Sequence, residues 1–370
     1  MPRSASRWQR AGAAITETFI VARLAVRLYS YLGLGWRWTF MLLRLIVYAL
    51  LLMPGFAQMV VFYMVSPRVR RSLVYGKAPR NRLDLYLPPA KAHNGSHAAA
   101  VPVVIYITGG AWTIGYKAWG SLLARRLSKQ GVLVACLDYR NFPQGTILDM
   151  LEDVNAGIAW TLEHAEEHGG DAQHTYLVGQ SCGAQLAALA LLTQAEQEAQ
   201  EAELPGGSPR WAPARIRALV GVSGVYNVAG LADHFHERGL YRPLLERIMS
   251  QDGQPELRLF SPAHCIKGVK WGGRLPRVVL LHGTADRCAL VGNAEQFAEA
   301  LRDAGAQVEV VLYEGETHTS PLIENPMRGG RDRLTDDVLA RVLERPGMES
   351  RQAPMCPGLL IRAAAAVCPF

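Results

Sequence analysis

Short apolar segments alternate with helical patterns along most of the chain after its first 70 residues. Most of these segments are rich in Val, Leu and Ile, which is typical of buried strands, whereas the first alternates apolar and polar residues and predicts a half-exposed strand. The predicted strands are residues 82–87, 101–108, 132–137, 176–178, 218–222, 278–281 and 308–313. Helical patterns fall between or after them, at residues 147–165, 184–192, 294–304 and 333–344. The alternation predicts an α/β fold with a mostly parallel sheet and helices on both faces.

The first part of the chain follows a different pattern. Residues 19–34 are apolar but interrupted by two arginines one helical turn apart, which indicates an interfacial amphipathic helix. Residues 45–64 carry no formal charge and are long enough to cross a bilayer, with a kink expected at Pro54. We therefore interpret residues 1–70 as a membrane-anchoring region. One span and two half-inserted helices both fit the pattern, and a helical hairpin packed on the rest of the protein is the alternative.

The remaining boundaries follow from the same pattern. We expect residues 71–345 to form the α/β domain and the tail, 346–370, to be poorly ordered. Residues 227–261 interrupt the alternation of strands and helices. Either a lid or acyl-pocket insertion, or a plain surface excursion, would account for that interruption.

Composition narrows the class of protein. The 370 residues are 49% hydrophobic and carry a formal net charge of +7, much of it from arginines in the first part of the chain. No nucleic-acid-binding motif accompanies these arginines, so a basic membrane flank is favoured over a nucleic-acid partner. The six cysteines are scattered, without C-x-x-C or metal-ligand spacing with histidine. We accordingly expect neither a metal nor a cofactor.

A G-x-S-x-G motif carries the main chemical signal. Gly179, Ser181 and Gly183 stand between a predicted strand and an Ala/Leu-rich helix, which is the context of a nucleophile elbow. Such a tight turn predicts a strained serine backbone, with glycines where a side chain would collide with neighbouring elements. The helix N-terminus behind the serine offers free N–H groups to a developing negative charge.

A serine nucleophile needs a base, and the base needs an orienting carboxylate. In α/β-hydrolases the chain order is serine, acid, histidine. Asp286 follows the strand predicted at 278–281, and His318 is the only histidine after it, just past the last predicted strand. We therefore predict Ser181, Asp286 and His318 as the catalytic residues of an α/β-hydrolase fold preceded by N-terminal membrane helices.

The predicted oxyanion hole is made of backbone N–H donors. One donor is Cys182, the residue after the nucleophile, and the others are Gly109, Gly110 and Ala111, which follow an early strand as in the glycine loop of lipases and esterases. Only the main chain of Cys182 is needed, and its side chain is expected to point away when Ser181 points into the site.

Three further segments carry a family resemblance. Residues 108–122, 138–145 and 325–330, including the threonine-led glycine loop and the Tyr-Lys-Ala-Trp run at 116–119, resemble the isoprenylcysteine α-carbonyl methylesterases of plants. The resemblance covers roughly 75–330. It implies hydrolysis of the methyl ester on a prenylated C-terminal cysteine, with contact to membrane lipid at the endoplasmic reticulum, the Golgi apparatus or both. The tail finds no counterpart.

Two other functions remain open. A membrane-anchored carboxylesterase acting on other lipid or small acyl esters would use an identical triad. A non-catalytic hydrolase-like receptor is disfavoured because such proteins commonly lose the histidine, and His318 is present.

Overall fold

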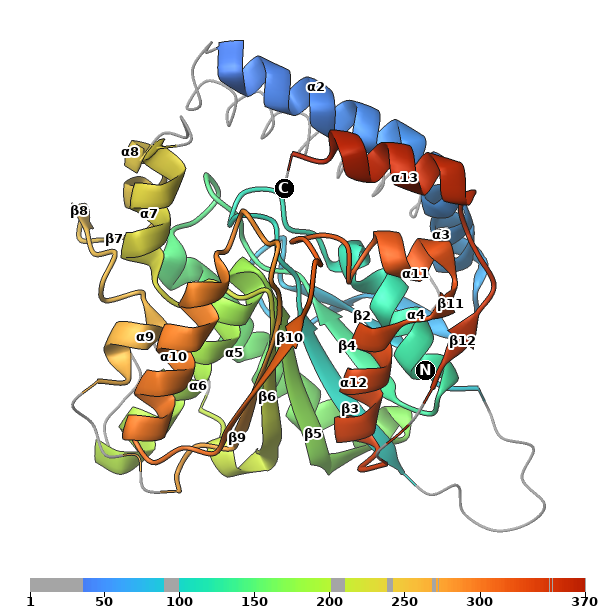
Figure 1. The fold of residues 1–370 in the computed structure, drawn as a ribbon. Helices are drawn as coiled ribbons and strands as arrows, with labels where there is room; N and C mark the ends of the chain where they lie inside the picture. Colours follow the sequence, from blue (N-terminus) through green and yellow to red (C-terminus); the bar gives the residue numbers. More distant parts are fainter. Residues whose placement is uncertain are drawn as a thin grey trace, which may run out of the picture.

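A mixed sheet forms the centre of the molecule (Figure 1). The computed structural model describes residues 36–89, 100–200, 210–237, 242–267, 271, 273–345, 347 and 349–369. Within them, eight strands run in the order β1-β2-β4-β3-β5-β6-β9-β10. All neighbours pair in parallel except β1 with β2 and β2 with β4. The strands are β1 Val69–Val74, β2 Arg82–Tyr86, β3 Val101–Ile107, β4 Leu133–Leu137, β5 Gly170–Gln180, β6 Ile216–Val222, β9 Arg277–Gly283 and β10 Val308–Tyr313.

Helices cover both faces of this sheet, as the alternation predicts. In β3, Val103 and Ile105 point into one apolar core and Val104 and Tyr106 into the other, which is why the strand has no polar alternation. Helices α5, α6 and α10 pack on the first face, and α4 and α12 on the second. Their bounds are α4 Ser121–Lys129, α5 Ile147–His164, α6 Cys182–Gln200, α10 Val291–Asp303 and α12 Arg333–Val342.

The antiparallel edge differs from the sequence prediction in two ways. Strand β1 was not predicted, because its arginines were assigned to the membrane flank. Strand β2 was predicted to be half-exposed, but Asp84 in its middle is fully buried. The reason is a buried partner: Lys117 Nζ lies 3.5 Å from Asp84 Oδ1, and the Tyr63 hydroxyl donates to Asp84 Oδ2 at 2.7 Å. The alternation of apolar and polar residues therefore predicted the wrong exposure for this strand, because Asp84 faces a second core rather than water.

The apolar N-terminal stretch forms two helices, α2 Trp36–Leu51 and α3 Met53–Val65. Among the described residues no single helix is long and apolar enough to cross a bilayer, although these two together pass that test with a bend of 67° between them. The bend comes where Pro54, which cannot donate a backbone hydrogen bond, begins the second helix. The predicted amphipathic helix at 19–34 lies outside the described residues.

The tail is not poorly ordered, contrary to the sequence prediction. Strand β12 Arg351–Gln352 pairs with β11 Gly330–Arg331, and helix α13 Gly358–Val367 lies beside α2 above the carboxyl ends of the sheet strands (Figure 1). Ile361 and Ala364 of α13 are fully buried in an apolar cluster with residues of α2 and α3. The composition of the tail did not reveal this, because α13 is stabilised by a partner helix distant in the sequence.

Polar contacts tie the two ends of the chain together. The Arg44 guanidinium of α2 donates to the Val367 and Cys368 carbonyls at 3.0 and 2.8 Å, and Gln58 of α3 donates to the Met355 carbonyl at 2.7 Å. These two polar side chains of the apolar N-terminal stretch therefore bind carbonyl groups of the tail.

The interrupting segment at 227–261 folds into short elements beside the sheet. They are α7 Val228–Glu237, α8 Arg242–Ile248 and a small hairpin of β7 Ser250–Gln251 and β8 Gln254–Pro255, followed by α9 Pro262–Cys265. In Figure 1 α7 and α8 stand opposite α13 across the top of the molecule.

Candidate active site

Ser181 sits at the sharp turn between β5 and α6. Its φ of 54° lies in the left-handed region, which confirms the predicted backbone strain. The Ser181 amide is held by the Val222 carbonyl at 2.9 Å. A side chain at Gly179 would place its Cβ 2.5 Å from Ala184 Cα, and one at Gly183 would collide with the Ile107 and Thr108 carbonyl oxygens. The two glycines are therefore required by the neighbouring main chain.

The structure brings together the three side chains that the sequence selected. His318 Nε2 lies 3.0 Å from Ser181 Oγ, and His318 Nδ1 lies 2.7 Å from Asp286 Oδ2. Because an ionised carboxylate only accepts hydrogen bonds, Nδ1 carries the ring hydrogen and Nε2 is left as the acceptor facing the serine hydroxyl. This arrangement can take the serine proton as the hydroxyl attacks a carbonyl carbon.

The carboxylate of Asp286 is saturated with donors. Oδ1 accepts from the Cys288 and Ala289 amides at 2.8 and 2.9 Å, while Oδ2 accepts from His318 and lies 3.3 Å from His282 Nε2. Burial alone would raise the pKa of Asp286, but hydrogen bonds from His282 and His318 outweigh it and hold that pKa well below its usual value. Asp286 is therefore an anion at neutral pH.

The glycine loop after β3 has an unusual backbone. Gly110, Ala111 and Trp112 all have positive φ angles, of 130°, 48° and 60°. A side chain at Gly110 would place its Cβ 2.6 Å from Gly115 Cα, so both the angle and the packing require glycine. Successive residues in such conformations turn their amides toward a common point, which suits an oxyanion.

One predicted oxyanion donor is already engaged. The Gly109 amide donates to Gln180 Oε1 at 3.1 Å, so it is not available to a substrate oxygen. For the amides of Gly110, Ala111 and Cys182, the described residues provide no oxygen acceptor. These three amides are therefore not bound to a protein oxygen, although those of Gly110 and Ala111 face the Cys182 sulfur. The sequence could not reveal the role of Gln180, because the contact joins loops that are far apart in the chain.

Comparison with known proteins decides the family. The chain is 45% identical to the probable isoprenylcysteine alpha-carbonyl methylesterase ICMEL1 of Arabidopsis thaliana, over 98% of this chain and 75% of the relative. It is 44% identical to the Arabidopsis isoprenylcysteine alpha-carbonyl methylesterase ICME, over 97% of this chain and 83% of that protein. The chain belongs to the isoprenylcysteine α-carbonyl methylesterase family. It is accordingly a carboxylic ester hydrolase.

More distant comparisons agree with this assignment. The family model described as BD-FAE matches residues 83–301. Esterase LipC of Mycobacterium tuberculosis is 31% identical over 70% of this chain and 62% of its own length. Among solved structures, an inhibited esterase B from Lactobacillus rhamnosis aligns with a TM-score of 0.62 at 18% identity, covering 89% of this chain and 96% of its own. That likeness shows the α/β-hydrolase fold.

The side chain of Cys182 has a contact that sequence reasoning missed in this methylesterase-family chain. Its sulfur accepts from the Trp112 amide at 3.3 Å and lies 3.7 Å from the Tyr139 hydroxyl, which itself donates to the Thr108 carbonyl at 2.9 Å. The side chain points away from the reacting centre, as expected, but toward the glycine loop. Burial raises the pKa of the Cys182 thiol, which leaves it protonated and a poor nucleophile.

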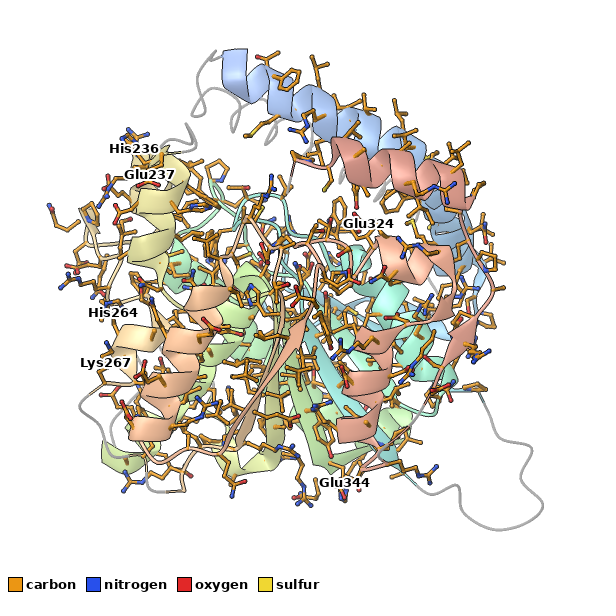
Figure 2. All side chains as sticks on the ribbon, viewed as in Figure 1. His236, Glu237, His264, Lys267, Glu324 and Glu344 are labelled. Carbon is orange, nitrogen blue, oxygen red and sulfur yellow. The ribbon has the colours of Figure 1, made fainter. Side chains whose placement is uncertain are left out.

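The loop that carries His318 is bound to helix α11, Glu324–Arg328, and to the end of helix α13 above it. The Thr319 hydroxyl donates to Glu324 Oε1 at 2.9 Å and lies 3.4 Å from Cys368 Sγ. Glu324 belongs to α11 and lies beneath α13 in Figure 2. Burial raises the pKa of Glu324, and the Thr319 hydroxyl offsets part of this rise. The tail thus touches the residue next to the histidine.

No group of three or more metal-ligating side chains is found among the residues that the structure describes. The six cysteines are free thiols, of which Cys136, Cys182 and Cys356 are buried. The chemistry of the site can be written with protein groups and water.

Proposed function

We propose that this protein hydrolyses the methyl ester of an isoprenylated C-terminal cysteine through an acyl-enzyme. The observation that carries the proposal is the hydrogen-bonded chain from Ser181 through His318 to Asp286, in a sequence 45% identical to a probable isoprenylcysteine methylesterase. The buried, saturated carboxylate supports the role of Asp286, because it fixes the ring hydrogen of His318 on Nδ1.

In the first half of the proposed reaction, Ser181 Oγ attacks the ester carbonyl carbon while His318 Nε2 takes its proton. The imidazolium that forms is stabilised by the Asp286 carboxylate. The negative oxygen faces the amides of Gly110, Ala111 and Cys182, and losing one such donor typically costs about 10²–10³ in rate. Collapse of the tetrahedral intermediate transfers the proton from His318 to methanol, which leaves.

In the second half, water replaces methanol. His318 Nε2 takes a proton from the water as its oxygen attacks the acyl carbon, and the same amides hold the second oxyanion. The proton then returns to Ser181 Oγ as the free carboxylic acid departs. The products are methanol and a cysteine with a free carboxyl group.

We further propose that α2 and α3 hold the enzyme on membrane lipid. Each helix exposes large apolar side chains: Phe40, Leu42, Leu43, Ile46, Val47, Leu50, Met53, Val60, Val61, Met64 and Val65 are all at least 43% exposed. We call these residues the apolar face. So many exposed apolar side chains on two neighbouring helices are unusual in a monomeric soluble protein. No acidic residue lies in either helix, which suits a position against anionic headgroups.

The substrate gives such a position a purpose. Each buried CH₂ of a prenyl chain contributes about 0.8 kcal/mol to partitioning, so the prenylcysteine ester concentrates in lipid. An enzyme that lies on the bilayer meets it there. We propose the endoplasmic reticulum or Golgi membrane as its location, on the strength of the family resemblance alone.

The deciding experiment is release of methanol from farnesylcysteine methyl ester by the purified protein. We expect kcat/KM for this ester to exceed that for a short p-nitrophenyl ester. A clear preference for the p-nitrophenyl ester would instead favour a general carboxylesterase, the activity that the name of esterase LipC suggests for that relative.

A further inference from the structure

His282 is a second histidine in contact with the catalytic carboxylate. It lies at the end of β9 and is only 1% exposed. Its Nε2 lies 2.6 Å from the Ala289 carbonyl oxygen and 3.3 Å from Asp286 Oδ2. Both of these neighbours are oxygen acceptors, so Nε2 carries the ring hydrogen and His282 is a donor at this position.

Two histidine rings and two backbone amides contact the Asp286 carboxylate, one pair at each oxygen. Asp286 Oδ1 faces the amides of Cys288 and Ala289, and Oδ2 faces the two imidazole rings. Turning the plane of the carboxylate away from this orientation would break contacts on both sides. The His282 bond to the Ala289 carbonyl also closes the turn from 286 to 289 against β9.

We infer that His282 is a positioning residue for the catalytic triad. By holding Ala289 and facing Asp286 Oδ2, it fixes the direction in which the carboxylate receives His318 Nδ1–H. It does not touch the substrate or exchange a proton with it. This inference rests on the proposed role of Asp286, and it adds a fourth side chain to the three that the sequence selected.

A pair of substitutions separates hydrogen bonding from packing. In His282→Gln the side-chain amide nitrogen can reach the place of Nε2 and donate there, whereas His282→Leu fills a similar volume without a donor. We expect His282→Leu to lower kcat by about 10- to 100-fold with little change in KM, because a small misplacement of a catalytic group has costs of this size. His282→Gln should recover most of that loss.

A matched control lies one residue away. Leu281 is fully buried on the opposite face of the same strand, away from the triad. Leu281→Ala should lower the melting temperature while leaving kcat close to wild type, which separates a loss of fold stability from a loss of positioning. The assay uses an ester that the wild-type enzyme turns over. Failure of the mechanism would thus appear in the wild-type protein, and failure of this inference only in the variants.

An NMR measurement on the wild-type protein tests the inference without any variant. Nitrogen NMR of the wild-type protein with ¹⁵N-labelled histidine should show the ring hydrogen of His282 on Nε2. The Nδ1–H tautomer at His282 would overturn the inference. So would a kcat in His282→Leu within twofold of wild type, or a His282→Gln variant as impaired as His282→Leu.

Discussion

At the scale of single residues, the active site depends on which atom carries each exchangeable hydrogen. The Asp286 carboxylate fixes the hydrogen of His318 on Nδ1, at 2.7 Å, and so leaves Nε2 free to face Ser181 at 3.0 Å. The left-handed backbone of Ser181 holds its hydroxyl at that place. A substitution at any of these three residues should therefore impair proton transfer more than it lowers the stability of the fold.

Removing the nucleophile tests the assignment of Ser181. Ser181→Ala should lower ester hydrolysis by about 10⁵- to 10⁶-fold, because no other group at the site attacks the carbonyl carbon. The fold should be retained, as a melting curve followed by circular dichroism would show. Ester turnover near the wild-type rate in this variant would contradict the assignment.

A substitution of Asp286 tests which nitrogen of His318 carries the ring hydrogen. Asp286→Asn should lower kcat by about 10⁴-fold, because the amide group can donate to His318 Nδ1 and drive the ring hydrogen onto Nε2. Steady-state kinetics measure this loss directly. A kcat reduced less than about tenfold would show that Asp286 does not orient the histidine.

The same variant has a pH-dependent effect on stability. Because the folded-state pKa of Asp286 is depressed, its carboxylate stabilises the fold fully at pH values above the unfolded-state pKa of about 3.9. This contribution is lost as pH falls through the lower folded-state value. Urea unfolding should therefore find the largest gap between wild type and Asp286→Asn at about pH 7, and a gap that narrows below about pH 4. A gap that widens on acidification would contradict the sign of the shift.

At the scale of elements, a buried ion pair joins helix α3, strand β2 and the loop after the glycine turn. Lys117 and Asp84 are 1% and 0% exposed, and Tyr63 of α3 bonds to the same carboxylate. Burial alone would lower the pKa of Lys117, but Asp84 and Tyr116 outweigh it and hold that pKa above its usual value. This pair fixes helix α3 to the sheet edge next to the glycine loop.

Replacing one member of this ion pair should destabilise the fold more than replacing both members. Lys117→Met leaves the Asp84 charge buried without its cation and should lower the free energy of unfolding by about 3 kcal/mol. Lys117→Met combined with Asp84→Asn should recover much of that loss, since no unpaired charge remains. Urea unfolding of the two variants provides the comparison, and equal stability of the single and double variants would contradict the expectation.

The apolar face of α2 and α3 has its own test. Leu50→Lys and Val61→Lys, at two positions that are each 60% exposed, should together weaken binding to phosphatidylcholine–phosphatidylserine vesicles by tenfold or more, roughly the cost of a charge at the apolar boundary. Leu259→Lys is the matched control, because Leu259 is 49% exposed but lies far along the chain from α2 and α3. Vesicle flotation would contradict the proposed face if the Leu50→Lys, Val61→Lys double variant bound as well as the wild type and the Leu259→Lys control.

At the scale of the whole molecule, the first and last helices that the structure describes form one layer above the active site (Figure 1). Helices α2 and α13 lie side by side there (Figure 1), and Arg44 closes the contact by bonding to the Val367 and Cys368 carbonyls. Since Cys368 also contacts Thr319, the layer is continuous with the loop of the catalytic histidine.

A charge inside this layer should detach it. Ile361→Asp places an unpaired carboxylate where the native side chain is fully buried, and should make α13 susceptible to limited proteolysis. Leu359→Asp, at a position of the same helix that is 69% exposed, is the matched control and should leave the digestion pattern unchanged. Equal protection of both variants would show that α13 does not depend on this contact.

The sequence by itself determined the α/β fold and the choice of three side chains that the structure brings together. Strand segments with no polar alternation were visible as apolar runs, and the chain order of serine, acid and a single later histidine left one assignment for Ser181, Asp286 and His318. These features are local, or depend only on order along the chain, so a pattern of residue types is enough to find them.

Only the tertiary structure decided the partners of those residues. The engagement of Gly109 by Gln180, the burial of Asp84 beside Lys117, the contact of His282 with Asp286 and Ala289, and the packing of α13 on α2 each involve two segments brought together by folding. The type of a residue says which bonds it can make, but its position in space selects the one that forms. For that reason the tail and the strand β2 were misjudged, whereas the three side chains of the predicted triad do lie together.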